Sequence, residues 1–343
     1  MLCFFLSFLT ALLIAPVIIK TTKRLKFGQN ILEYVVEHTS KQGTPTMGGF
    51  IFIIPTIIIS LFFVKSNYTI PILVLAIFLG YGIIGFLDDF IKVKFKRNLG
   101  LHAYQKIIFQ LSIALIVAVY VYKSSLLQNS IFIPFTTIKL DLGLFIIPFI
   151  VLVFLATSNS VNLTDGLDGL AGSVSLVFFI AISFFNLFYT SFFSSSLSIE
   201  YLTQMQNINT ICFAVSGSLL AFLLFNGHPA CIFMGDTGSL ALGGLIATIC
   251  AFSGLSLYII VIGFMFVLSS VSVIIQVISF KLTKKRVFLM APFHHHLQHK
   301  GMHENKIVVI YIVITILLAV LSGILLMNIL WKVLKIILFM VSV

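Results

Sequence analysis

Polar side chains interrupt an apolar sequence between Asn159 and Gly172, which reads Asn-Ser-Val-Asn-Leu-Thr-Asp-Gly-Leu-Asp-Gly-Leu-Ala-Gly. Its two carboxylates, Asp165 and Asp168, are three residues apart and each precedes a glycine. A carboxylate at bilayer depth costs at least about 2.5 to 3.5 kcal/mol, so it is kept where it lines a wet cavity or performs chemistry. Glycine lets the backbone approach a ligand closely. We therefore predict a ligand-binding loop that includes Asn162, Asp165 and Asp168.

Three further clusters contain carboxylates, cations or imidazoles. They are Asp88-Asp89 with Lys92, Lys94, Lys96 and Arg97; Phe233 to Gly238, which contains Asp236; and Met290 to His296, which ends in His294, His295 and His296. Carboxylates without cysteine are ligands for Mg²⁺ or Mn²⁺, which proteins bind together with substrate phosphates. Lysines neutralise phosphoryl charge. Together the clusters predict a site for a polyanion bridged by a divalent cation.

Each cluster also has a simpler interpretation. Adjacent aspartates at a helix end are often a solvated flank, and on a helix Asp88 and Asp89 point about 100° apart, which favours two separate roles. Three consecutive histidines cannot all face one zinc ion. The four cysteines lie singly without CxxC spacing, so we expect neither disulfides nor a zinc site.

Composition identifies an integral membrane protein. The chain has 343 residues, of which 60% are hydrophobic and 9% charged, and its mean hydropathy is +1.17. A span needs about 20 mostly apolar residues. We expect ten: Leu2–Ile19, Gly48–Val64, Ile70–Leu87, Ile107–Tyr122, Leu142–Thr157, Leu170–Tyr189, Ile208–Phe225, Leu240–Leu257, Tyr258–Phe280 and Ile307–Leu330.

The predicted fold is an all-α polytopic membrane protein with about ten transmembrane helices, forming one domain over residues 1–343. We expect a tight turn at Ser253-Gly254 between the eighth and ninth spans and a short hairpin over Asn129–Leu142. The tail 331–343, with Trp331, Lys332 and Lys335, suits an interfacial anchor.

The distribution of Lys and Arg predicts the orientation. Ten spans divide these 21 residues into sixteen on one side and five on the other, and the richer side is expected to be cytoplasmic. Both termini are then periplasmic. All eight histidines and eight of the ten carboxylates fall on the cytoplasmic side, so we place the active site there.

At these residues the chain resembles the phospho-N-acetylmuramoyl-pentapeptide-transferase family. The motifs are Gly43-Thr-Pro-Thr-Met-Gly-Gly49, Gly85-Phe-Leu-Asp-Asp-Phe90, Asn162 to Ala171, Phe233 to Gly244 and Met290 to His296. The resemblance runs from the first span to the tenth. It implies a magnesium-dependent enzyme of peptidoglycan synthesis in the bacterial inner membrane. The reaction transfers phospho-N-acetylmuramoyl-pentapeptide from its UDP-linked donor to undecaprenyl phosphate, giving lipid I and UMP.

The resemblance also implies residue roles. Asp236 resembles the magnesium ligand, Asp88 the base acting on the lipid phosphate, and Asp89 and His294 further catalytic residues. It implies that Phe233 stacks on the uracil of the donor and that Gly166, Leu167 and Asp168 bind the edge of this base. The residues implied around the ribose and diphosphate are Lys41, Thr46, Asn162, Asp165, Gln276 and His295. Lys92 and Lys106 are implied to bind phosphates, and His296 completes the histidine motif. It implies a homodimer, and we expect no nucleic-acid partner.

Alternatives remain at this point. Polyprenyl-phosphate N-acetylglucosamine-1-phosphate transferases share the aspartate motifs but differ in the histidine loop, and ion-coupled transporters also use intramembrane aspartates. A direct single displacement is expected, with a covalent phospho-aspartate as the other route. Two positions depart from the family pattern, Ser269-Ser270 and Gln298, where acids are usual. Residues 281–306 are the candidate lid.

Overall fold

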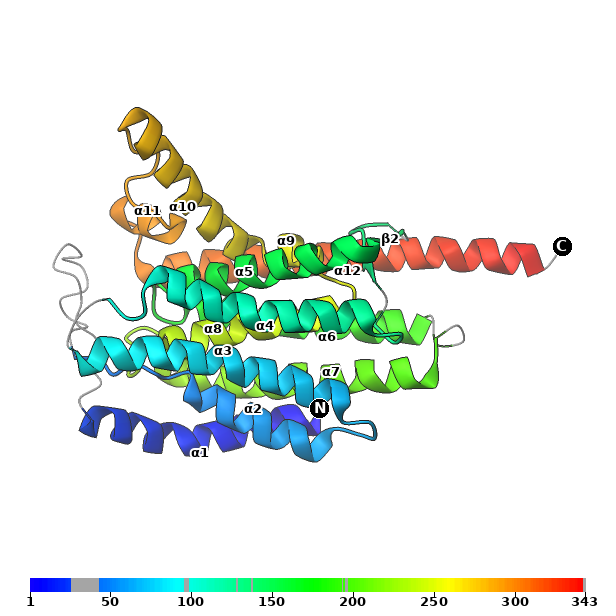
Figure 1. Ribbon diagram of the computed structural model, residues 1–343, viewed down its shortest axis with the longest axis horizontal. Helices are drawn as coiled ribbons and strands as arrows, with labels where there is room; N and C mark the ends of the chain where they lie inside the picture. The colour runs from blue at the N-terminus through cyan, green and yellow to red at the C-terminus, as the bar shows by residue number, and fades with distance from the viewer. Residues whose placement is uncertain are drawn as a thin grey trace.

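A computed structural model describes residues 1–25, 43–95, 99–127, 129–136, 138–192, 194 and 197–341, with side chains up to residue 328 (Figure 1). Over this part of the chain the fold is almost entirely helical. The helices are α1 (Leu2–Arg24), α2 (Phe50–Phe63), α3 (Thr69–Lys94), α4 (Ala103–Lys123), η2 (Gly143–Phe145), α5 (Ile146–Thr164), α6 (Leu170–Phe192), α7 (Ile199–Asn226), α8 (Gly235–Phe252), α9 (Tyr258–Ile262), α10 (Phe264–Thr283), α11 (Phe293–His299) and α12 (Glu304–Val341).

Helix α8 lies at the centre of the bundle. Every residue from Thr237 to Phe252 is buried, and the helix packs between α3 and α5. Small residues make this possible, because a Cβ on Gly243 would lie 2.5 Å from the backbone of Ser158 on α5. Helix α7 packs against α1, α2 and α6. The most buried helix therefore begins at the motif that contains Asp236.

The α3–α8 contact gives a prediction with a matched control. A Cβ on Gly85 would overlap the carbonyl of Asp236, whereas a Cβ on Gly82, one turn earlier, would come no closer than 3.3 Å to Ile53. We expect Gly85→Ala to destabilise the protein by about 1 to 3 kcal/mol, as overpacking does. Gly82→Ala should have little effect. Melting temperatures in detergent test this, and equal values for the two variants would contradict the packing described here.

The number of membrane helices is close to the expectation. Among the described residues nine helices are long and apolar enough to cross a membrane, while α2, in the expected second span, has 14 residues. The chain is thus an all-α, multi-pass membrane protein. The turn at Ser253-Gly254 is present, with Gly254 at φ +72°. The expected hairpin forms as antiparallel strands β1 (Ser130–Phe132) and β2 (Lys139–Asp141).

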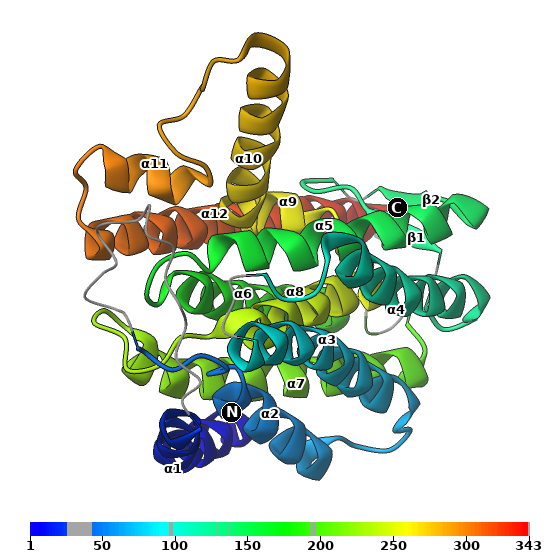
Figure 2. The same cartoon turned by 60° about the vertical axis from the view of Figure 1, so that its left-hand side comes forward.

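Several predicted bounds were wrong. Helix α7 begins at Ile199, nine residues before the expected Ile208, and α3 and α5 each end seven residues later than expected, at Lys94 and Thr164. The ninth predicted span is divided at Gly263 into the short helix α9 and the longer α10, which projects away from the bundle (Figure 2). A continuous apolar run does not reveal this break, because hydropathy carries no information on where the helix axis changes direction. Helix α12 continues through Leu330, the expected end of the last span, to Val341, and extends beyond the bundle (Figure 1).

Candidate active site

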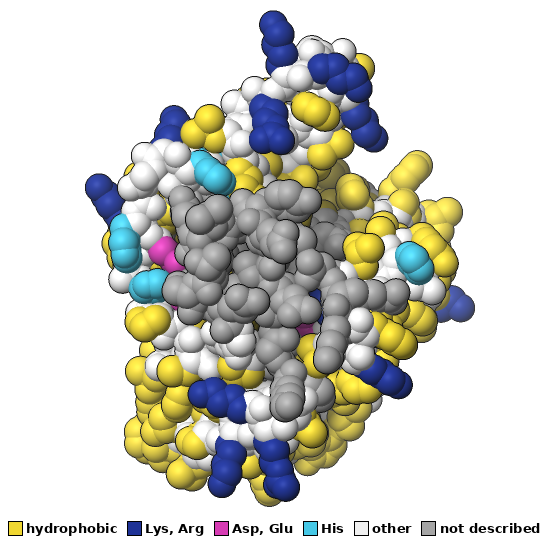
Figure 3. Space-filling view, turned by 90° about the vertical axis from the view of Figure 1, so that its left-hand side faces the viewer, with side chains coloured by type: hydrophobic (Ala, Val, Ile, Leu, Met, Phe, Trp, Pro, Cys, Tyr) yellow, Lys and Arg dark blue, Asp and Glu magenta, His cyan; other side chains and the backbone are white. Residues whose placement is uncertain are grey.

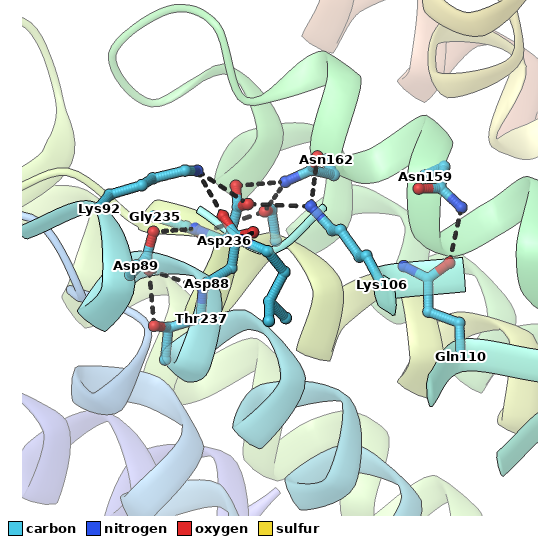
Figure 4. Close-up of polar contacts among 12 residues, drawn as sticks. Asp88, Asp89, Lys92, Lys106, Gln110, Asn159, Asn162, Gly235, Asp236 and Thr237 are labelled. Atoms are coloured by element: carbon cyan, nitrogen blue, oxygen red, sulfur yellow. Dashed lines mark hydrogen bonds and ion pairs between the residues drawn. The ribbon is translucent and has the colours of Figure 1, made fainter. Parts of the chain in front are cut away.

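Asp236 lies in the first turn of α8, where α3, α4 and α5 meet it. Its Oδ1 accepts a hydrogen bond from Asn162 Nδ2 at 2.7 Å, and its Oδ2 is 2.9 Å from Lys106 Nζ and 3.1 Å from Lys92 Nζ. The two lysines approach from opposite sides (Figure 4). Three helices besides α8 therefore fix one carboxylate.

Asp89 holds the beginning of α8. Its carboxylate accepts hydrogen bonds from the backbone N–H of Asp236 at 3.1 Å and of Thr237 at 2.9 Å, and from the Thr237 hydroxyl at 2.7 Å. A helix N-terminus has unpaired N–H groups and a partial positive charge, so a carboxylate there is stabilising. Gly235 has φ +73°, and a Cβ on it would lie 2.5 Å from Asp89 Oδ2. Glycine at 235 thus permits this cap.

Asp88 makes different contacts from its neighbour, as the helical offset predicted. Its Oδ1 accepts a hydrogen bond from Leu101 N at 2.9 Å, and its Oδ2 is 2.6 Å from Lys92 Nζ. The side chain is 4% exposed and that of Lys92 is 25% exposed. Lys92 consequently links Asp88 to Asp236.

A second polar pair lies one helical turn from Lys106 and Asn162. Asn159 Nδ2 donates to Gln110 Oε1 at 2.9 Å (Figure 4). Residues 106 and 110 on α4, and 159 and 162 on α5, lie three or four apart and so share a helix face. The pair cross-links α4 to α5 directly beside the site.

The three aspartates can hold a divalent cation. One oxygen from each of Asp88, Asp89 and Asp236 lies within 4.8 Å of the others. An oxygen-only set of ligands of this kind fits a hard cation. Lys92 and Lys106 add two positive charges beside the carboxylates, which can bind the phosphate groups of a substrate. The described residues contain one more such group, Asp168, His228 and Glu304. That group includes an imidazole and is less suited to a hard cation.

The loop between α5 and α6 carries the remaining polar residues of the central motif. Burial raises the pKa of Asp165 well above its usual range, and the nearby carboxylates Asp236, Asp89 and Asp168 add to this. The neutral form of Asp165 is therefore favoured more than that of an exposed aspartate.

The histidine segment lies against this loop. Gly166 has no room for a side chain, because a Cβ would overlap His294 Nε2 and lie 3.1 Å from His295 Nε2. His294 is fully buried, and burial lowers the pKa of its imidazole well below the usual range, with His295 contributing. His294 is therefore neutral at physiological pH.

Comparison with known proteins decides the family. Glycosyl transferase family 4 matches residues 70–254. A phospho-N-acetylmuramoyl-pentapeptide-transferase of Clostridium kluyveri is 45% identical over 91% of the chain and 95% of that protein. The enzymes of the same name from Thermoanaerobacter sp. (45% identical, 92% of the chain, 95% of the relative) and Clostridium botulinum Eklund 17B (43%, 92% and 93%) are similarly close. The chain belongs to the phospho-N-acetylmuramoyl-pentapeptide-transferase family.

The resemblance stated from the motifs is thereby confirmed, and the structure places the residues that the family resemblance implied. Phe233 is half-buried, and its backbone bonds to Pro45 and Gly48. Thr46 is buried beside Gly235. Leu167 is buried, and Lys41 lies outside the described residues.

Two of the implied residues face partners within the protein. The side-chain amide of Gln276 is bonded to the loop after α10. Its Oε1 accepts hydrogen bonds from the N–H groups of Val287 and Phe288, and its Nε2 donates to the Phe288 carbonyl at 3.0 Å. His296 Nδ1 accepts from Leu289 N at 3.1 Å. In this structure both organise residues 287–289, which lie within the segment 281–306 that was expected to act as a lid.

Several contributors were missed from the sequence. Ser239 accepts a hydrogen bond from Asn162 Nδ2 at 2.8 Å, and Thr237 binds Asp89 as described. Both lie in the Asp236 motif at helical spacing, a signal that was available. His228 and Glu304 contact Asp168 and lie far from it in sequence. No spacing rule brings these two residues to it.

Proposed function

We propose that this protein transfers phospho-N-acetylmuramoyl-pentapeptide from UDP to undecaprenyl phosphate, releasing UMP and forming lipid I. The observation that carries the proposal is the convergence of Asp88, Asp89 and Asp236 with Lys92 and Lys106 at the start of α8. Relatives at 42–45% identity bear the name of this activity.

The residues have separable roles in the proposed reaction. Attack of one phosphate on another depends on charge neutralisation and positioning more than on covalent chemistry by the protein. Lys92 and Lys106 hold phosphoryl oxygens, and Asn162 orients Asp236 through its 2.7 Å hydrogen bond. Asp88 takes the proton of the lipid phosphate, and Asp89 keeps the N-terminus of α8 in place. This arrangement supports a direct displacement.

Magnesium is the proposed cofactor. Asp236 is the proposed ligand, with Asp88 and Asp89 close enough to contribute. When bound, the ion neutralises the diphosphate of the donor and stabilises the charge that develops on transfer.

The nucleotide is proposed to lie between the α5–α6 loop and the histidine segment. Gly166, Leu167 and Asp168 meet the uracil, Phe233 stacks on it, and Thr46, Asp165, His294 and His295 surround the ribose and diphosphate. The closeness of Gly166 to His294 and His295 supports one continuous surface. Lys41, Gln276 and His296 are proposed to act from the surrounding loops.

We propose that the site faces the cytoplasm from the bacterial inner membrane. Lys and Arg side chains surround the end of the bundle where α3 ends and α8 begins (Figure 3). An excess of these residues marks the cytoplasmic side. The termini then lie in the periplasm. The proposed assembly is a homodimer, to be measured by mass photometry in nanodiscs.

A purified-protein assay tests the function. We expect UMP release from UDP-N-acetylmuramoyl-pentapeptide with undecaprenyl phosphate in the presence of Mg²⁺, loss of release with a chelator, and recovery when Mg²⁺ is restored. UDP-N-acetylglucosamine should not replace the donor. Release only from UDP-N-acetylglucosamine would assign the chain to the related transferases, and release from neither donor would refute the proposal.

A further inference from the structure

Three segments that are distant in sequence meet at Asp168. His228 Nδ1 donates to Asp168 Oδ2 at 3.1 Å and lies 3.5 Å from Glu304 Oε2. Asp168 N donates to Glu304 Oε1 at 2.6 Å. We call Asp168, His228 and Glu304 the clamp.

The clamp is an internal contact. Asp168 is 5% exposed and Glu304 7% exposed. A buried carboxylate is costly unless polar groups bind it. Here the Asp168 backbone N–H binds Glu304, and His228 lies against both carboxylates. Ala230 N also donates to Asp168 Oδ2, at 3.1 Å. Both residues that flank Pro229 are thus attached to a single oxygen.

Each clamped segment carries a part of the proposed nucleotide site. Asp168 directly follows Gly166 and Leu167. His228 precedes Phe233 by five residues, and Glu304 begins α12 immediately after the segment that carries His294 and His295. Separation of any one segment would disperse residues that must surround a single nucleotide.

Asn226 adds a neighbouring bridge. Its Oδ1 accepts from Gly169 N at 3.0 Å, and its Nδ2 donates to the Ile232 carbonyl at 2.9 Å. The α5–α6 loop and the segment before α8 are therefore joined twice, whereas among these contacts Glu304 alone brings in α12.

We propose that His228 and Glu304 are positioning residues for the nucleotide of the donor, acting through Asp168. This inference rests on the proposed function and deepens it. The same three residues also have the composition of a transition-metal site. The direct clamp is favoured because their polar atoms already bond to one another and to the backbone.

Two substitutions of His228 separate positioning from general disruption. His228→Leu removes the donor to Asp168, and His228→Asn keeps an N–H near the position of Nδ1. The His228 side chain is 29% exposed, so neither change should unfold the protein. Glu200→Gln is the matched control, because Glu200 is an exposed carboxylate on the first turn of α7 that accepts from Asn67 Nδ2 at 2.8 Å.

We expect His228→Leu to raise the KM for the UDP-linked donor and the Kd for UMP about tenfold, as loss of one hydrogen bond to a charged group does. The kcat and the KM for undecaprenyl phosphate should stay unchanged. His228→Asn and Glu200→Gln should resemble the parent protein. Calorimetric titration of UMP measures the Kd, and melting temperatures monitor the fold.

Other outcomes would overturn the clamp. They are a fall in kcat with an unchanged donor KM, a His228→Asn variant as impaired as His228→Leu, or stoichiometric Zn²⁺ binding by the parent protein that His228→Leu abolishes. The UMP titration does not depend on turnover. If the parent protein binds UMP but releases none from the donor, the proposed function fails while the clamp is still tested by its Kd.

Discussion

Asp236→Asn is expected to lose about 1,000-fold in kcat, the upper range for removal of one preorganised electrostatic contact. The amide keeps the shape and can still accept from Asn162, but it removes the negative charge between Lys92 and Lys106. It also removes the proposed ligand of the cation. Initial rates of UMP release at several Mg²⁺ concentrations measure the effect.

A control separates this loss from a change in stability. Asp141→Asn alters an exposed carboxylate on β2 that accepts from Gly143 N, and it should keep full activity. The melting temperature of Asp236→Asn should stay near that of the parent protein. Activity of Asp236→Asn within tenfold of the parent would show that this carboxylate is not the centre of the site.

Asp88→Asn is expected to lower turnover several-fold at pH 5.5, where most of the lipid phosphate still carries the proton that the base removes. The loss should shrink as pH rises, because a phosphate monoester has a second pKa of about 6 and then needs no base. The rate ratio of variant to parent between pH 5.5 and 8.5 measures this. Below pH 6 the deficit should be largest.

The pH dependence distinguishes two roles of Asp88. Its carboxylate also pairs with Lys92 at 2.6 Å, and loss of that pair alone would misplace the lysine equally at every pH. A deficit that is constant across the range would therefore refute the base role. Lys92→Arg, which keeps the charge but not the shape of the cation, shows how far lysine placement matters.

Those parts of the fold that depend on apolar runs and on one turn glycine could be predicted from the sequence. Runs of apolar residues located most helices, and Gly254 marked the turn before α9. The break at Gly263 could not be recognised, since the flanking residues are as apolar as those of a continuous span. Nor could the end of α12 be found, because the apolar character persists beyond Leu330.

The site was partly predictable for a different reason. Aspartates are costly near a membrane, so Asp88, Asp89, Asp165, Asp168 and Asp236 stand out in the sequence. Which of them share partners depends on helix packing that composition does not encode. Asp89 is consequently found as the cap of α8 and Asp168 within the clamp, roles that only the three-dimensional contacts reveal.

The central position of α8 limits how this enzyme family can diverge. The helix that carries Asp236 in its first turn is also the one on which α3 and α5 pack, so a change that tunes the reaction there also alters the hydrophobic core. Peripheral segments such as α10 and the loop after it pack less extensively against the other helices. New donor or lipid preferences should therefore arise in those segments, while the first turn of α8 varies little.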